Sequence, residues 1–243
     1  MKKDWFIDWF NTEYYHILYQ NRNETEASNF IDKLCNHLNM KDGNKVLDLA
    51  CGKGRHTIHL AKKGYISTGL DLSEHSIAKA KELMVDGAHF ALHDMRHVYK
   101  SNHFDYVFNL FTSFGYFNNT RDNIDVLSAI CENLRPHGIL VLDFFNVKKV
   151  LHNLIIEETK EIDSIIFNIR RYFDGTHINK NICVKDQKKE FHFQERVSAF
   201  IMKDFQKMAS ISGLNIVKVF GDYHLNIFEE EHSDRLILLL KKN

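Results

Sequence analysis

The chain has 243 residues, of which 44% are hydrophobic, and its 32 Lys and Arg residues balance its 32 Asp and Glu residues. This length and composition suit one α/β domain with an insertion, and the neutral charge provides no long-range attraction to nucleic acid or to an anionic membrane. No segment reaches the run of about 20 apolar residues that spans a bilayer. We therefore expect a cytoplasmic protein with a small or neutral partner.

The first 40 residues are expected to form an N-terminal helical cover. Residues 3–39 have helical patterns, and the first part is rich in aromatic side chains. Such a stripe is typical of a helix that packs against the domain, and a lid over a ligand is the alternative. The aromatic residues are Trp5, Phe6, Trp9, Phe10, Tyr14, Tyr15 and Tyr19.

From Val46 to Phe145, short apolar runs alternate with amphipathic segments. The runs are VLDLA, YISTGL, AHFAL, FDYVFNL and GILVLDFF, and helical patterns such as SEHSIAKAKELM separate them. Strands that are apolar throughout and alternate with helices predict a parallel sheet with helices on both faces.

The pattern changes after Asn146. Residues 158–198 contain the alternating runs SIIFNIRRYF, THINKNICV and KEFHFQERVSAF, which predict antiparallel strands. A helix DFQKMASIS, ended by Gly213, and the strand candidates LNIVKVFGDY and RLILLLKK follow. We therefore predict a Rossmann-like α/β fold with a seven-stranded, mostly parallel sheet. Its core comprises residues 41–146 and 199–243, and residues 147–198 form an antiparallel β insertion that covers the substrate.

Neither the cysteines nor the histidines predict a metal site. No CxxC pair is present, and no histidine pair at helical spacing carries the glutamate of an HExxH motif. We expect no bound metal and four reduced thiols, at Cys35, Cys51, Cys131 and Cys183.

The strongest motif is VLDLACGKGRHT, in which an apolar strand carries Asp48 and leads through a glycine loop into a helix. Glycines allow a ligand to approach the backbone, and the helix presents unpaired amides. Asp71 lies at the end of the next strand, where an acid binds ribose hydroxyls in nucleotide-binding βαβ units. The dinucleotide fingerprint GxGxxG is not met, because Thr57 occupies the position of the third glycine. A carboxylate before the glycines suits an amino-acid ammonium, which favours S-adenosylmethionine (SAM) over a dinucleotide.

With these motifs the chain resembles the class I SAM-dependent methyltransferases, whose first motif DxGxGxG appears here as DLACGKG from Asp48 to Gly54. Ala50 replaces the first glycine, as in relatives of glycine N-methyltransferase. The resemblance continues through GLDLS, HDMR, FDYVFNLFTSFGYF and LRPHGILVLDFFN, and it covers about residues 12–146. It implies a methyltransferase that uses SAM, forms S-adenosylhomocysteine (SAH) and methylates a small-molecule acceptor by in-line displacement.

The resemblance also implies the residues that bind the cofactor. Asp71 would accept hydrogen bonds from the ribose hydroxyls, and Asp94 would receive the adenine amino group. The alternatives are a helix-capping acid for Asp71 and a solvated turn residue for Asp94. Tyr19 and Arg22 would hold the cofactor carboxylate. The full set, with residues beside the adenine and beneath the methionine part, is Tyr19, Arg22, Asp48, Ala50, Cys51, Gly52, Asp71, Leu72, Asp94, Met95, Asn109 and Leu110.

The acceptor is less well specified by the sequence. The fourth motif reads NLFTSF instead of (N/D)PPY, and a Pro-Cys nucleophile is absent, so nucleic acid is a disfavoured substrate. Methyl transfer does not require a base, and we assign no catalytic residue. Two alternatives remain: a methyltransferase acting on RNA or protein, and a SAM-binding protein without catalysis. Candidates for the acceptor pocket are Tyr15, Thr112, Ser113, Tyr116, Phe144, Asn146, Arg196 and His224.

Overall fold

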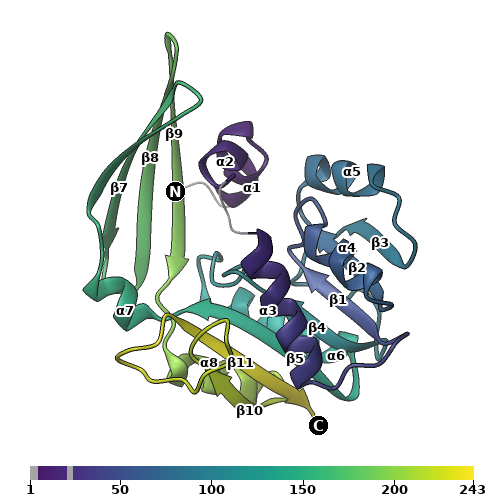
Figure 1. Ribbon diagram of the computed structural model, residues 1–243. Coiled ribbons are helices and arrows are strands. Elements are labelled where there is room, and N and C mark those ends of the chain that lie inside the picture. Colours follow the sequence, from purple (N-terminus) through teal and green to yellow (C-terminus); the bar gives the residue numbers. More distant parts are fainter. Residues whose placement is uncertain (1–4, 21–23) are drawn as a thin grey trace.

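The computed structural model describes residues 5–20 and 24–243 of the chain (Figure 1). Within these residues, seven strands form one sheet in the order β10-β11-β5-β4-β1-β2-β3. Neighbouring strands from β5 to β3 are parallel, whereas β11 is antiparallel to both β5 and β10. The predicted Rossmann-like sheet is therefore confirmed. Its strands are β1 (Lys45–Leu49), β2 (Ile66–Asp71), β3 (Ala88–Leu92), β4 (Phe104–Asn109), β5 (Leu134–Phe145), β10 (Leu214–Phe220) and β11 (Arg235–Lys242).

Helices cover both faces of this sheet, which explains why its central strands are apolar throughout. Leu140, Val141 and Leu142 of β5 are all fully buried. One face packs on α6 and α8, and the other packs on α3 and α4. The helices of this part of the chain are α3 (Glu24–His37), α4 (Arg55–Lys62), α5 (Glu74–Glu82), α6 (Thr120–Asn133), α7 (Val147–His152) and α8 (Met202–Ile211).

The helices that follow β2 and β4 begin at polar caps. The Ser73 hydroxyl accepts a hydrogen bond from the Ser76 N–H at the start of α5. Asn119 accepts one from the Asp122 N–H at the start of α6. Such caps satisfy amides that have no partner within the helix, and they fix where the chain turns back over the sheet.

A second sheet is formed by β6 (Glu157–Ile162), β7 (Ile165–Phe173), β8 (His177–Asp186) and β9 (Lys189–Ser198). All its neighbours are antiparallel, and we call it the insertion sheet. In Figure 1 it stands apart from the seven-stranded sheet, and the short helices α1 (Trp5–Phe10) and α2 (Glu13–Leu18) lie between it and α5.

Aromatic side chains join α1 and α2 to the apolar face of the insertion sheet. The ring centroids of Trp9 and Phe193 are 4.6 Å apart, and those of Tyr14 and Phe191 are 5.1 Å apart. These contacts bury large apolar areas on both sides, so the N-terminal helices and the insertion sheet support each other. None of the helices in the described part of the chain combines the length and apolarity that crossing a bilayer requires.

Candidate active site

A cavity of about 490 Å³ lies at the carboxyl ends of β1 and β2 and beside the segment that follows β4. Its other side is formed by residues of α1 and α2. Parallel α/β sheets bind ligands at this edge. A larger, more open hollow of about 740 Å³ lies between α1 and the insertion sheet, and none of the motif residues line it. We therefore take the smaller cavity as the candidate site.

The glycine loop, residues 50–54, forms the floor of the cavity. Ala50, Gly52 and Gly54 have φ values of 60°, 55° and 81°, in the left-handed region. A Cβ built on Gly54 would lie 2.5 Å from the Phe90 ring, whereas one built on Gly52 would meet nothing within 4 Å. Gly54 is thus required by close packing, and Gly52 leaves open space where a ligand can approach the backbone.

Asp48 lies beneath this loop with only 3% of its surface exposed. Its Oδ2 accepts a hydrogen bond of 2.7 Å from the Thr57 hydroxyl. Burial raises the pKa of Asp48 to about 7, and the nearby carboxylate of Asp71 contributes to the rise. Thr57, which occupies the position of the third glycine in a dinucleotide-binding loop, therefore supports the Asp48 carboxylate. A bound cation would favour the ionised form of Asp48.

Asp71 closes the adjacent side of the cavity at the end of β2. Its Oδ2 accepts the Gly52 N–H at 2.8 Å, and its Oδ1 accepts the Ser73 N–H at 2.8 Å. Burial raises the pKa of Asp71, and these backbone donors oppose part of that rise. Each oxygen keeps a lone pair, so the carboxylate can also accept hydrogen bonds from two hydroxyls of a sugar.

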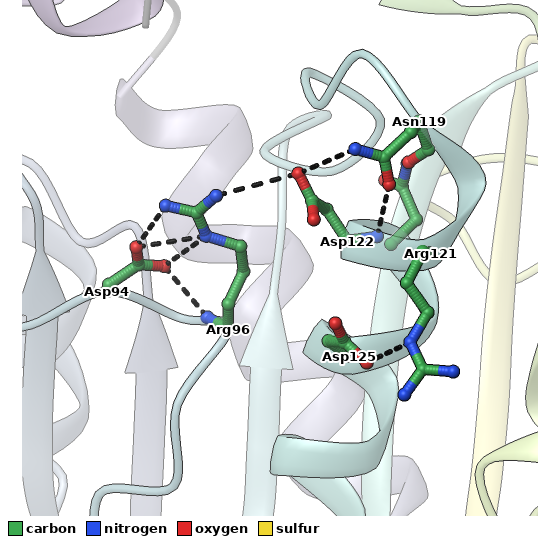
Figure 2. A network of polar contacts seen from close by, with 7 residues as sticks. Asp94, Arg96, Asn119, Arg121, Asp122 and Asp125 are labelled. Atoms are coloured by element: carbon green, nitrogen blue, oxygen red, sulfur yellow. Dashed lines mark hydrogen bonds and ion pairs between the residues drawn. The ribbon is translucent and has the colours of Figure 1, made fainter. Parts of the chain in front are cut away.

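Asp94 does not line the cavity, although its neighbours His93 and Met95 do. In Figure 2, Arg96 lies between Asp94 and Asp122, and its guanidinium faces the carboxylate of Asp94. The Arg96 Nε lies 3.0 Å from one Asp94 oxygen and 3.1 Å from the other. Burial acts in the opposite direction, but Arg96 holds the pKa of Asp94 below its usual value. An adenine amino group would have to share this carboxylate with Arg96.

Aromatic rings of α1, α2 and the segment after β4 form the opposite wall. The Phe10 centroid lies 4.8 Å from that of Tyr15 and 5.4 Å from that of Tyr116. Tyr19 also lines the cavity, but its hydroxyl donates to Glu195 of the insertion sheet at 2.7 Å. Burial, with the charge of Glu195, raises the pKa of Tyr19 well above its ordinary value.

The cavity brings together most of the predicted cofactor residues that the structure describes. Arg22, the expected partner of the cofactor carboxylate, lies outside the described residues. Burial raises the pKa of the Cys51 thiol well above its ordinary value, which disfavours the thiolate form that a nucleophile needs. The predicted residues in the lining are Tyr19, Asp48, Ala50, Cys51, Gly52, Asp71, Leu72, Met95 and Leu110, together with the acceptor-pocket candidates Tyr15, Ser113 and Tyr116.

Three further candidates lie outside the lining because the fold uses their side chains. Asn109 is fully buried, and its amide donates to a carbonyl of β1 at 3.4 Å. Phe144 is fully buried and stacks on Phe145 with ring centroids 4.3 Å apart. The side chain of Asn146 caps the first turn of α7.

The remaining pocket candidates also have structural partners elsewhere. The Thr112 hydroxyl accepts a hydrogen bond of 2.8 Å from Arg235. Arg196 donates to the Asn118 side chain at 3.1 Å. His224 lies on the exposed surface 2.7 Å from the amino group of a lysine in α3. None of these three side chains lines the cavity.

Several residues that line the cavity were not predicted from the sequence. Lys53, Arg55 and His56 enter it from the glycine loop and the start of α4. The motif GKGRHT contained this signal, because basic side chains at the start of a helix that faces an amino-acid ligand can reach its carboxylate. Phe111 also lines the cavity, and its ring lies 4.7 Å from that of His56.

One group of side chains in the described part of the chain has metal-ligand chemistry. The ligand atoms of Cys183, Glu190 and His192 lie within 4.8 Å of one another on the insertion sheet. His192 already contacts the Glu190 carboxylate at 3.0 Å, and none of the three lines the cavity. The absence of a metal therefore stays a prediction.

Comparisons with known proteins agree with this geometry. Residues 40–210 match a family model described as "Methyltransferase domain". The putative methyltransferase YqeM of Bacillus subtilis is 26% identical over 212 residues, which cover 82% of this chain and 84% of that protein. A dTDP-3-amino-3,4,6-trideoxy-alpha-D-glucopyranose N,N-dimethyltransferase of Streptomyces venezuelae is 29% identical over 138 residues, which cover 55% of this chain and 56% of that protein. The crystal structure of a SAM-dependent methyltransferase from Clostridium acetobutylicum matches with a TM-score of 0.80 at 21% identity. The match covers 95% of this chain and 96% of that one.

Proposed function

Since this chain belongs to the methyltransferase domain family and is a SAM-dependent methyltransferase, we propose that it transfers the methyl group of SAM to the nitrogen of a small-molecule amine. The observation that carries the proposal is the cavity itself. The carboxylates of Asp48 and Asp71 and an open glycine loop form one side, and aromatic rings form the other. The first side suits a nucleoside joined to a cationic amino acid, and the second suits a compact acceptor.

The residues on the cofactor side divide between the two parts of SAM. Asp71 accepts the ribose hydroxyls with the lone pairs that its backbone donors leave free. Asp48 balances the ammonium group, and its own burial makes a nearby cation favourable. Lys53 of the glycine loop and Arg55 at the start of α4 provide positive charge for the carboxylate. When bound, SAM supplies the methyl group and leaves as SAH.

The bonding of three hydroxyl groups in the cavity is consistent with an amine acceptor. Tyr116 donates to the Thr112 carbonyl at 2.6 Å, Ser113 donates to the Leu110 carbonyl at 3.0 Å, and Tyr19 donates to Glu195. These hydroxyls are therefore already used as donors by the protein. An alcohol acceptor needs a strong base to remove its proton, whereas a neutral amine can attack without one.

The aromatic wall also favours an amine. During transfer, positive charge leaves the sulfur and develops on the acceptor nitrogen. The faces of Phe10, Tyr15 and Tyr116 carry partial negative charge, and they stabilise a cation in a desolvated site. The relative from Streptomyces venezuelae is named for the dimethylation of an amino sugar nucleotide, which is consistent with this chemistry.

Turnover with SAM carrying a labelled methyl group tests the proposal. The acceptor panel contains amino sugars, amino acids and simple amines, each paired with the matched hydroxyl compound, and mass spectrometry locates the label. We expect methylation of an amine and none of its hydroxyl partner. Label transferred to RNA or protein pools instead would contradict a small-molecule acceptor. SAM binding without turnover on any pool would favour the non-catalytic alternative.

A further inference from the structure

Two consecutive residues at the edge of the cavity, the first of which lines it, have a strained backbone. Phe111 and Thr112 have φ values of 58° and 60°, and neither is a glycine. This conformation is unfavourable for any side chain with a Cβ and most unfavourable for a β-branched one such as threonine. The pair directly follows Leu110 and precedes Ser113, both of which line the cavity. Strain of this kind persists only where the surroundings hold it.

Asp143 and Arg235 provide that hold, and we call them the ion-pair clamp. The fully buried Asp143 carboxylate accepts the Phe111 N–H at 2.7 Å, and its backbone carbonyl accepts the Thr112 N–H at 3.1 Å. Arg235 donates to the same carboxylate at 2.8 Å and to the Thr112 hydroxyl at 2.8 Å. Tyr223 adds a longer hydrogen bond of 3.3 Å to Asp143. Each strained residue is thus bonded to the clamp.

The strained backbone determines where the Phe111 ring lies. Its centroid is 4.7 Å from that of His56, 5.6 Å from that of Tyr223 and 6.2 Å from that of Phe30. His56 itself belongs to the lining at the start of α4. If Phe111 and Thr112 relaxed to negative φ, the ring would leave this position and the wall beside the methionine part of the cofactor would change shape.

Joining two strands does not require this ion pair. The ladder between β5 and β11 already pairs Phe144 with Leu236 and Leu142 with Leu238, and these side chains are buried. A buried ion pair adds little net stability compared with well-packed apolar side chains. What the ion pair does here is orient hydrogen-bond donors and acceptors toward Phe111 and Thr112.

We propose that Asp143 and Arg235 are positioning residues for the cofactor cavity, which hold Phe111 and Thr112 in the left-handed conformation and so fix the wall next to the transferred methyl group. This inference rests on the proposed function, because it takes the cavity to bind SAM. It extends the site to β11, more than 120 residues after the wall that it supports.

Two substitutions of Thr112 separate positioning from simple stability. Thr112→Val keeps the β-branched shape but loses the hydroxyl that Arg235 holds, so the strain remains with a weaker clamp. Thr112→Gly also loses the hydroxyl but removes the strain. We expect Thr112→Val to weaken SAH binding about fivefold to tenfold and Thr112→Gly to change it less than about threefold, as measured by calorimetry. The opposite order would overturn the proposal.

Arg235→Lys tests the clamp directly, because lysine keeps the charge but has only one nitrogen, whereas Arg235 directs two nitrogens, Nε and Nη2, at the Asp143 carboxylate. We expect it to weaken SAH binding about tenfold and Thr112→Gly to restore most of the loss in the double variant. Ser164→Gly is the matched control, since Ser164 has a φ of 65° in an exposed turn of the insertion sheet and should restore nothing. If Arg235→Lys does not fold, the comparison of Thr112→Val with Thr112→Gly still tests the proposal.

The outcomes separate the inference from the function on which it rests. A wild-type protein that does not bind SAH would overturn both. Wild-type binding with unchanged affinity in folded Arg235→Lys protein would overturn the inference alone. Loss of affinity that glycine at position 112 does not rescue would also overturn it, because the clamp would then act by some route other than backbone strain.

Discussion

Replacing Asp48 by asparagine is expected to stabilise the ligand-free protein at neutral pH and to weaken its affinity for SAM. Asp48 is almost completely buried, and its carboxylate accepts a hydrogen bond from the Thr57 hydroxyl. Asparagine has nearly the same size and keeps a carbonyl oxygen for Thr57, but it cannot ionise. The substitution therefore removes the buried negative charge with little change in packing.

The magnitude follows from the pKa of Asp48. Burial raises it from 3.8 to about 7 in the folded protein, so between these values the folded chain holds a proton that the unfolded chain has released. The contribution of Asp48 to the free energy of unfolding is complete below about pH 4 and is lost by about 1.4 kcal/mol per pH unit as the pH rises. The loss ends near pH 7 and amounts to about 4 kcal/mol. Asparagine has no such dependence.

Urea unfolding of the two proteins at pH 5, 6, 7 and 8 measures this difference. We expect the advantage of Asp48→Asn over the wild type to grow by about 3 kcal/mol across that range. Asp71 and Asp143, whose pKa values burial also raises, are present in both proteins, so the effect of their own burial largely cancels in the comparison. Asp86→Asn, which replaces an exposed aspartate, is the control. Its free energy of unfolding should differ from that of the wild type by the same amount at every pH. A stability difference between Asp48→Asn and the wild type that does not change with pH would refute the reasoning. Undiminished SAM binding by Asp48→Asn would refute the role of the Asp48 charge.

Three further outcomes are expected. Asp71→Ala should weaken SAM binding by about 1 to 3 kcal/mol in calorimetry, because the ribose loses its acceptors, and unchanged affinity would remove Asp71 from the site. Gly54→Ala should lower the urea midpoint more than Gly52→Ala, because both positions have positive φ but only a Cβ at Gly54 meets a phenyl ring of β3, at 2.5 Å; equal midpoints would argue against that close packing. Tyr19→Phe should speed amide exchange in α2 and leave α6 unchanged, because its hydroxyl bonds a glutamate of the insertion sheet; equal exchange in both proteins would show that this bond does not hold α2.

The sequence was most informative where one local pattern determines both structure and chemistry. Apolar runs such as GILVLDFF became strands that are buried on both faces, as β5 shows. The strand, glycine loop and Asp71 were adjacent motifs, and the parallel ladder brings Asp48 and Asp71 to one edge. The strand β6 had no such signal, because its sequence EETKEI is mostly charged.

Side-chain direction could not be obtained from the same patterns. Phe144 was placed near the end of its strand, but its ring points into the core, whereas its neighbour Asp143 makes the contacts that matter at the cavity. A strand alternates its faces at every residue, so knowing only the strand leaves this choice open. Asp94 shows a second limit: its partner Arg96 was in the same motif, but only the folded loop brings the two together.

The two sides of the cavity depend on different parts of the chain. The side that carries Asp48 and Asp71 is built from β1, β2 and the glycine loop, whose residues are close in sequence and carry recognisable motifs. The opposite side depends on distant supports, since Glu195 of the insertion sheet holds Tyr19 and Arg235 of β11 holds the wall after β4. Substitutions in these late segments can therefore reshape that wall while Asp48 and Asp71 keep their places.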